Sequence, residues 1–268
     1  MKKIIIFVLA LFFSNVQAQE QYTFAFVPQQ SAKVLAKKWG PILRYISDKS
    51  GYQLNFRTAP KIPVFEQRVS QGDYDFAYMN PVHYTVFAEA PGYRAFAKQK
   101  GKKIKGIFVV AKDSKIKELS DLKGSTLAFP APAAFAASVL PRGLLSEQKI
   151  EFKPKYVGSH DSVYMSVARG LYPAGGGIQR TFGTTSPAIR EKLKVLTITE
   201  GFTPHAFASH PRVPKEVVAA VQKAFVEMFS DAKGKELLLN VGFKKGAEKA
   251  SSSDWDDVRK LGYTELPK

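Results

Sequence analysis

Side chains that can donate hydrogen bonds follow several apolar, strand-like segments of this 268-residue chain. Tyr78 and Asn80 close one such segment, and His160 opens a helical pattern just after another. Phenol, amide and imidazole groups can all donate to an oxyanion. The plainer alternatives are a buried tyrosine, a helix-capping asparagine and a surface histidine, and capping by Asn80 is compatible with lining a cleft. The pattern indicates the binding of a small anion.

Further polar residues lie in the neighbouring loops. Gln29 and Gln30 follow the first strand-like segment and can supply amide donors, and Arg180 follows a run of three glycines and can neutralise an anion. Ser159 is placed to cap the helix that begins at His160. A polar turn and a surface arginine are the alternatives for the glutamines and for Arg180.

An aromatic cage is a second kind of site that the residue types allow. Aromatic faces bind alkylammonium groups through cation–π contacts. The candidate residues are Trp39, Tyr84, Phe129 and Phe135. The alternative is that these aromatic side chains belong to the hydrophobic core.

Motifs of enzymes and metal sites are missing from the sequence. The four histidines, at positions 83, 160, 205 and 210, show no metal-ligand spacing, and the chain has no cysteine. There is no Gly-x-Ser-x-Gly motif, and no Lys-Ser/Thr pair follows the glycine run as it would in a P-loop. Ser159, His160 and Asp161 are consecutive and cannot converge as a catalytic triad. We expect no enzymatic activity, no metal and no cofactor.

The first 18 residues have the pattern of a secretory signal peptide. Two lysines precede an apolar run over residues 4–13, and residues 16 and 18 supply small side chains at the −3 and −1 positions for cleavage after Ala18. The run is too short for a stable membrane anchor, which is the alternative. Cleavage removes Lys2 and Lys3 and lowers the net charge from +17 to +15. We expect a periplasmic protein without a lipid anchor that binds an anionic solute and no nucleic acid.

These donors are positioned by strand patterns that alternate with helix patterns. Strands are predicted at 22–27, 52–56, 74–79, 105–110, 125–129, 172–178 and 193–199. Helices are predicted at 31–50, 62–71, 80–88, 133–140, 160–169, 213–229 and 235–240. This order predicts an α/β fold with two similar lobes, each a mainly parallel sheet flanked by helices. Ligands of such sheets bind where strands end and helices begin, which is where the donors lie.

Two motifs resemble those of the phosphate/phosphite/phosphonate-binding proteins of ABC importers. Residues 74–84 (YDFAYMNPVHY) are similar to the first-lobe motif of that family, and residues 158–163 (GSHDSV) to its second-lobe histidine motif. Weaker similarities lie at residues 28–30, 39–41 and 121–124. The resemblance covers essentially the whole mature chain.

The resemblance implies a type II periplasmic binding protein with a ligand trapped between two lobes. Lobe 1 would comprise residues 22–110 and 204–268, and lobe 2 residues 111–203. Two crossover strands near 110–113 and 199–203 would form the hinge. The implied partner is an inner-membrane ABC permease or, alternatively, a membrane sensor kinase, and we expect a monomer. Tyr78 and His160 would face one shared cavity.

The chain departs from the family pattern at two places. The hydroxyl-rich Ser-Thr-Ser turn typical of the phosphonate binders is replaced by an alanine-rich stretch, so that Ala133, Ala134 and Phe135 offer only backbone N–H groups to an anion. Residues 173–179 contain no acid to pair with the amine of an aminophosphonate. We predict weak binding of inorganic phosphate and 2-aminoethylphosphonate, and better binding of another small anion or a partly apolar solute. The lysine-rich residues 98–103 are predicted to be a solvated hairpin tip, with a phospholipid contact as the alternative.

Overall fold

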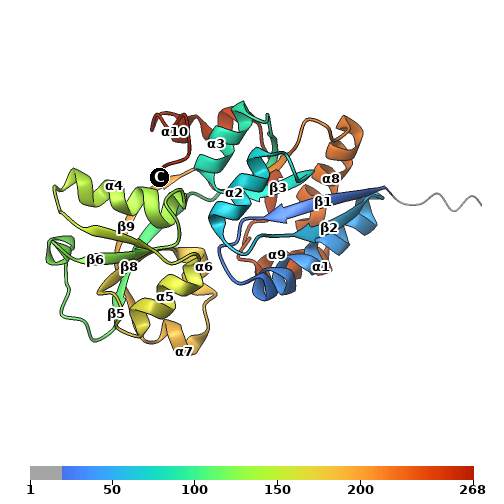
Figure 1. The fold of residues 1–268 in the computed structure, drawn as a ribbon. Helices are drawn as coiled ribbons and strands as arrows, with labels where there is room; N and C mark the ends of the chain where they lie inside the picture. Colours follow the sequence, from blue (N-terminus) through green and yellow to red (C-terminus); the bar gives the residue numbers. More distant parts are fainter. Residues whose placement is uncertain (1–19) are drawn as a thin grey trace, which may run out of the picture.

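The chain forms two α/β lobes that lie side by side (Figure 1). The computed structural model describes residues 20–268, so the predicted signal peptide at 1–18 lies outside the described residues. In Figure 1 the beginning and the end of the chain, blue and orange-red, share one lobe, and the green and yellow middle forms the other. Within the described part of the chain, no helix is long and apolar enough to cross a membrane.

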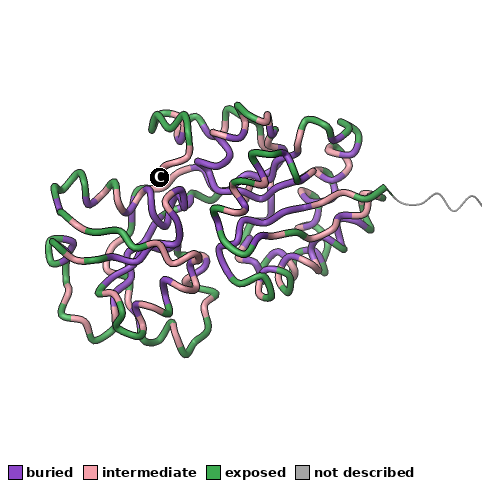
Figure 2. Tube along the Cα trace, viewed as in Figure 1, coloured by how far each residue is buried: buried purple, intermediate pink, exposed green. Residues whose placement is uncertain are grey.

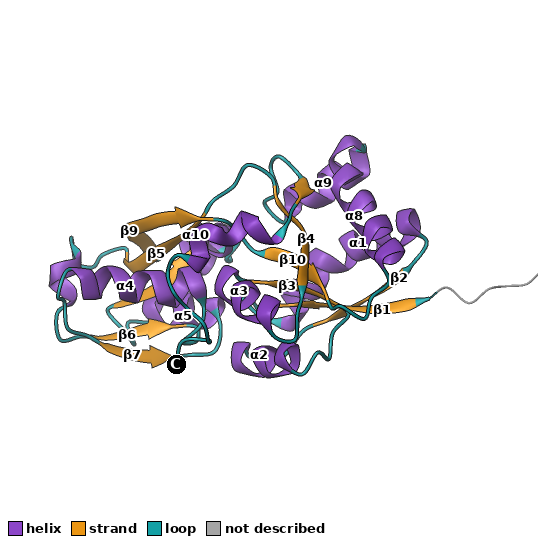
Figure 3. Ribbon diagram, turned by 90° about the horizontal axis from the view of Figure 1, so that it is seen from above, coloured by secondary structure: helices purple, strands orange, loops and turns teal. Residues whose placement is uncertain are grey.

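The first lobe is built on a six-stranded sheet of order β11-β4-β10-β3-β1-β2. Its strands are β1 (Gln21–Phe26), β2 (Gln53–Arg57), β3 (Phe76–Met79), β4 (Arg94–Gln99), β10 (Ala206–Ser209) and β11 (Ala247–Lys249). Its helices are α1 (Ala32–Ser50), α2 (Ile62–Ser70), α3 (Pro81–Glu89), α8 (Lys215–Glu227), η3 (Met228–Ser230), α9 (Ala232–Asn240), η4 (Ser252–Trp255) and α10 (Asp256–Arg259). Figure 3 shows α1, α8 and α9 on one side of the sheet and α2 and α3 on the other.

The second lobe is built on a five-stranded sheet of order β7-β6-β8-β5-β9. Its strands are β5 (Ile104–Ala111), β6 (Thr126–Phe129), β7 (Lys153–Tyr156), β8 (Ala174–Ile178) and β9 (Leu193–Phe202). Its helices are η1 (Leu119–Leu122), the π-helix η2 (Phe135–Val139), α4 (Leu140–Glu147), α5 (His160–Ala168), α6 (Gln179–Gly183) and α7 (Pro187–Arg190). Val110 faces Leu145 of α4, whereas Val109 faces Val163 of α5, so helices cover both faces as predicted.

Both sheets are mixed, which corrects the expectation of mainly parallel sheets. β1 pairs parallel with β2 and β3, and β6 with β7 and β8. β10 runs antiparallel to β3 and β4, β11 to β4, and β5 to β8 and β9. β5 and β10 each enter their sheet from the other lobe. Because no crossover helix of the same sheet precedes them, parallel pairing is not required of them.

The first passage between the lobes lies earlier in the chain than expected. β5 pairs with β8 and β9 in the second sheet, although residues 104–110 were assigned to the first lobe. The chain therefore crosses at residues 100–103 instead of 110–113, and again at 203–205, close to the expected 199–203. The prediction of a hairpin tip at residues 98–103 is wrong, because β4 and β5 belong to different sheets.

The sequence of α1 explains how the first lobe closes its core. Its buried side chains recur every three or four residues and include Leu35, Trp39 and Ile46. The Ser31 side chain accepts the backbone N–H of Val34 at the start of the helix, and Gly51 ends it with a φ of 82°. Figure 2 shows that in both lobes the buried residues lie mainly in the strands and on the sides of the helices that face them.

Glycines let β8 approach the helices that border the gap between the lobes. A Cβ on Gly176 would lie 2.1 Å from the carbonyl oxygen of Ala137 in η2. A Cβ on Gly177 would lie 2.4 Å from the hydroxyl of Tyr164 in α5. A side chain at either position would force the helix away from the sheet. The glycine run therefore fixes how close η2 and α5 come to β8.

Candidate functional site

The lobes meet around a small cavity, here called the inner cavity, that contains much of the predicted site. Its volume is about 10 Å³, enough for about one water molecule. Its polar lining consists of Gln29, Asn80, His160 and His205. Its apolar lining consists of Val27, Ile62, Ile104, Ala134, Phe135, Ala136, Ala137 and Ile178. The lining therefore offers contacts to both polar and apolar groups.

Hydrogen bonds join the two lobes beside the inner cavity. The backbone N–H of His160 donates to the carbonyl oxygen of Gln29 over 3.0 Å. The backbone N–H of Ser31 donates to the carboxylate of Asp161 over 3.2 Å. The structure is thus a closed form, and a solute larger than water can reach the inner cavity only when the lobes separate.

Asn80 both caps α3 and contacts the second lobe. Its side-chain oxygen accepts the backbone N–H of His83 over 2.9 Å, so the first turn of α3 fixes the orientation of the amide. Its side-chain nitrogen then donates to the carbonyl oxygen of Ala133 over 2.9 Å. Ala133 is buried and takes part through this carbonyl, whereas Ala134 and Phe135 line the inner cavity directly.

His160 lies at the start of α5 with a buried ring. Its Nδ1 atom is 3.0 Å from the hydroxyl of Thr181. Within residues 20–268 no hydrogen bond is formed by Nε2, and the ring lines the inner cavity. Burial, together with the positive charge of Arg180, lowers the pKa of His160 from 6.5 to about 3. The imidazole is therefore neutral at neutral pH.

His205 is a cleft residue that the sequence analysis did not identify. It lies in the second passage between the lobes, and its ring stacks on Tyr78 with the centroids 4.9 Å apart. Its Nε2 atom is 2.8 Å from the side-chain nitrogen of Gln29. Burial, with the charge of Arg180, lowers the pKa of His205 well below its ordinary value. The one sequence signal for this residue is its position just beyond the end of a strand.

Arg180 and Tyr78 line a second cavity of about 30 Å³, here called the outer cavity, which shares His205, Ile104 and Ile178 with the inner one. The Arg180 guanidinium lies 5.9 Å from the centre of the Tyr78 ring and donates to the side-chain oxygen of Gln29. Tyr78 and His160 therefore lie at neighbouring cavities, not at the single shared cavity that was predicted. Burial raises the pKa of Tyr78, so its hydroxyl stays protonated.

Two predicted residues point away from both cavities. Gln30 is buried, but its side chain accepts a hydrogen bond from Lys38 over 2.9 Å and lies 3.4 Å from the carboxylate of Asp161. Ser159 caps α5, because its hydroxyl accepts the backbone N–H of Ser162 over 3.1 Å. Both residues support the elements that carry the cleft residues.

The proposed aromatic cage is not formed. Trp39 stacks on Phe26 in the core of the first lobe, and Tyr84 packs against Trp255. Phe129 packs against Phe108 and Phe152 in the second lobe, and Phe135 against Phe202. Phe129 thus lies in the core of the second lobe, whereas the other three side chains belong to the large core cluster and have different aromatic neighbours, so that the four do not surround one common space.

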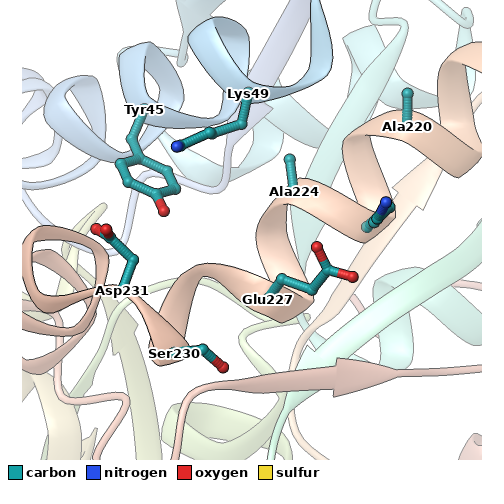
Figure 4. Close-up of a pocket in the computed structure, with 8 residues that line it drawn as sticks. Tyr45, Lys49, Ala220, Ala224, Glu227, Ser230 and Asp231 are labelled. Carbon is teal, nitrogen blue, oxygen red and sulfur yellow. The ribbon is translucent and has the colours of Figure 1, made fainter.

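A larger hollow of about 600 Å³ lies on the outside of the first lobe (Figure 4). Tyr45 and Lys49 of α1 border it on one side, and Glu227, Ser230 and Asp231 on the other. Its lining carries both acidic and basic side chains, so it does not favour ligands of one charge as the cleft does. No Asp or Glu is among the residues, within the described 20–268, that line the inner and outer cavities.

The two lobes, the paired passages and the donor-lined cleft define a type II periplasmic binding protein. The family model for the periplasmic substrate-binding protein of ABC phosphonate transporters matches residues 24–255. The chain belongs to this family.

Solved structures with the same fold include two proteins named for phosphonates. One is a binding protein component of an ABC phosphonate transporter from Pseudomonas aeruginosa, with a TM-score of 0.83 and 17% identity over 91% of this chain and 86% of that one. Another is PhnD1 from Prochlorococcus marinus in complex with methylphosphonate, with a TM-score of 0.82 and 16% identity over 91% of this chain and 97% of that one. A protein from Xanthomonas citri bound to ATP is also similar, with a TM-score of 0.68 and 16% identity over 91% and 96% of the two chains.

Proposed function

We propose that this protein captures a small oxyanion between its lobes and presents the closed form to an inner-membrane ABC permease. The observation that carries the proposal is a cluster of nitrogen donors at the lobe interface, formed by Gln29, His160, His205 and Arg180. No carboxylate of the described chain lines these cavities, so an anion meets no like charge there. The mechanism is differential affinity, because a ligand that contacts both lobes favours closure.

The ligand has a compact anionic head and a small apolar part. Because the closed cavity holds only about one water, the lobes must stand further apart around the ligand, whose head then lies beside His160 and His205 and whose apolar part lies against Ala134, Phe135 and Ala136. Methylphosphonate, the ligand in the Prochlorococcus marinus structure, has this character. An aminophosphonate would leave its ammonium group without a carboxylate partner among the lining residues.

The mature protein acts as a monomer in the periplasm and catalyses no reaction. The leader over residues 1–18 is cleaved between Ala18 and Gln19. The intact mass of protein from the periplasmic fraction tests this: a chain that begins at Gln19 is expected, and a chain that retains Met1 would contradict it.

A thermal-shift screen of the mature protein tests the ligand class. Phosphonates, other small oxyanions and methylated amines are compared. A ligand at 100 times its dissociation constant should stabilise the protein by about 2.7 kcal/mol. Methylphosphonate should raise the melting temperature more than inorganic phosphate or 2-aminoethylphosphonate. Stabilisation by the amines alone would overturn the proposal.

A further inference from the structure

Two chains of hydrogen bonds end on the two histidines of the inner cavity, His160 at the start of α5 and His205 in the second passage between the lobes. The first runs from the backbone of Ile178 through Tyr164 and Thr181 to His160. The second runs from Arg180 through Gln29 to His205. Each chain starts at a group that can only donate, which fixes the directions in the second chain, and the contact lengths indicate those in the first.

The first chain begins at the backbone N–H of Ile178, which donates to the Tyr164 oxygen over 3.1 Å. The Tyr164 hydroxyl must then donate elsewhere, and its shortest contact is the Thr181 oxygen at 2.8 Å, against 3.2 Å to the Ile178 carbonyl. The Thr181 hydroxyl in turn is 3.0 Å from Nδ1 of His160 and 3.3 Å from the Ile178 carbonyl. Donation along the shorter contacts makes Nδ1 an acceptor and leaves the proton of His160 on Nε2.

The second chain begins at the Arg180 guanidinium, which has donors and no acceptor. It donates to Gln29, which identifies the bonded atom of the Gln29 amide as its oxygen. The amide nitrogen of Gln29 therefore faces Nε2 of His205 at 2.8 Å and can only donate to it. The proton of neutral His205 must then be on Nδ1.

We propose that these relays hold the two cleft histidines in opposite tautomers, so that each presents an N–H donor and the site selects oxyanions that carry no proton of their own. This inference rests on the proposed function and specifies its ligand class. The low pKa values of both imidazoles are consistent with neutral donors at neutral pH.

Four acceptor oxygens beside the inner cavity each already accept one hydrogen bond, which favours ligands that bring no donor of their own. The Gln29 side-chain oxygen is bonded to Arg180, and the Asn80 side-chain oxygen to the backbone of His83. The carbonyl oxygens of Gln29 and Ala133 accept bonds from the opposite lobe. A ligand hydroxyl or ammonium group would have to share an oxygen that already accepts a hydrogen bond, and a buried donor that is left poorly paired is costly. Fully ionised phosphonates and sulfonates meet this requirement, whereas inorganic phosphate retains a hydroxyl.

Nitrogen NMR of the histidine side chains in the ligand-free mature protein tests the relays. We expect His160 with its proton on Nε2 and His205 with its proton on Nδ1 at neutral pH. Thr181→Val removes the hydroxyl and keeps the shape, so His160 should change to a mixture of tautomers. Thr181→Ser should restore the wild-type spectrum, and Thr184→Val, an exposed change nearby, should leave it unaltered. His160 with its proton on Nδ1 in the wild type would overturn the proposal.

Titration calorimetry with methylphosphonate, methanesulfonate and inorganic phosphate tests the selection. At a pH where methylphosphonate is fully ionised, it should bind at least about tenfold more tightly than inorganic phosphate. Thr181→Val should weaken methylphosphonate binding about tenfold, with Thr184→Val unchanged. Equal affinity for phosphate, or an unaltered Thr181→Val, would overturn the selection. Failure of all three anions to bind would instead refute the proposed function, and the NMR result would still decide the relays.

Discussion

At the scale of single residues, the positive charge of the cleft comes from Arg180 and from the lysines at 102, 103 and 105 that line the outer cavity, whereas burial keeps both cleft histidines neutral. Arg180 uses one N–H group on Gln29 and lies over Tyr78, so its other N–H groups remain for an anion. A charge-assisted hydrogen bond contributes about 1.5–3 kcal/mol. Arg180 therefore has two roles: it attracts the anion by its charge, and its hydrogen bond orients the side-chain amide of Gln29.

Arg180→Met should weaken methylphosphonate binding by roughly 10- to 100-fold, because it removes that charge-assisted bond. Titration calorimetry measures the change. Arg169→Met, at the exposed end of α5, makes the same change in net charge away from the cleft and should leave the affinity unaltered. Equal losses in the two variants would mean that only the overall charge matters.

Acid should destabilise the ligand-free protein through His160. The folded-state pKa is about 3 and the ordinary value is 6.5. Between these values the unfolded chain binds a proton that the folded chain excludes, so the free energy of unfolding falls as the pH falls from 6.5 towards 3. From pH 7 to pH 4.5 this amounts to about 2–3 kcal/mol.

Urea unfolding of wild type and His160→Gln at both pH values measures this contribution. Asp75 and Asp257, whose pKa values are lowered by their hydrogen-bond partners despite partial burial, lose stabilisation over acid pH in both proteins. The difference between the two proteins isolates His160, and wild type should lose more. An identical pH dependence would contradict a buried, neutral imidazole.

Sequence alone placed Gln29, Asn80 and His160 correctly at the lobe interface, because each follows a strand end and the topology brings strand ends together. It missed His205, which depends on the path of the chain between the lobes. It also assigned Gln30 and Ser159 to the cleft, although their side chains support the loops. The local backbone geometry decides which of two adjacent loop residues faces the cleft. The residue types alone do not specify that geometry.

At the scale of elements, the glycines of β8 determine where the cleft helices lie. Gly176→Ala would place a methyl group 2.1 Å from the backbone oxygen of Ala137, so η2 must move. We expect a loss of roughly 1–3 kcal/mol in the free energy of unfolding, the usual cost of overpacking. Gly143→Ala, on α4 with open space around it, should be neutral or slightly stabilising.

Denaturant unfolding compares the two glycine variants. Because η2 carries Ala136 and Ala137 of the inner cavity, Gly176→Ala should also weaken methylphosphonate binding. A Gly176→Ala protein as stable as Gly143→Ala would show that β8 and η2 are not held in close contact.

The long amphipathic helices were predictable, because their apolar periodicity is local. The predicted helix at 31–50 matches α1 at Ala32–Ser50, which Gly51 ends. The short strands β4, β10 and β11 were not predicted. They pair with one another across more than a hundred residues, so tertiary contacts define them and local pattern does not. The π-helical start of the helix predicted at 133–140 likewise depends on packing against β8.

At the scale of the whole molecule, the lobes are closed on a nearly filled interface. The inner cavity has a volume of about 10 Å³, and hydrogen bonds from His160 and Asn80 cross between the lobes. Ligand uptake therefore requires the lobes to rotate apart about the passages at residues 100–103 and 203–205. The two-lobed organisation could be predicted from the alternation of strands and helices. The position of the first passage could not, because the sequence of β5 is compatible with a strand of either sheet.

Titration of methylphosphonate into the mature chain measures whether an oxyanion binds between the lobes. We expect one binding site per chain, and affinity weakened at least about tenfold in His205→Ala, whose imidazole the sequence pattern did not reveal as a donor. His210→Ala, which changes a histidine beside Tyr93 outside the cleft, should bind as wild type does. The absence of binding by methylphosphonate and other small oxyanions, or full affinity in His205→Ala, would contradict an oxyanion site between the lobes.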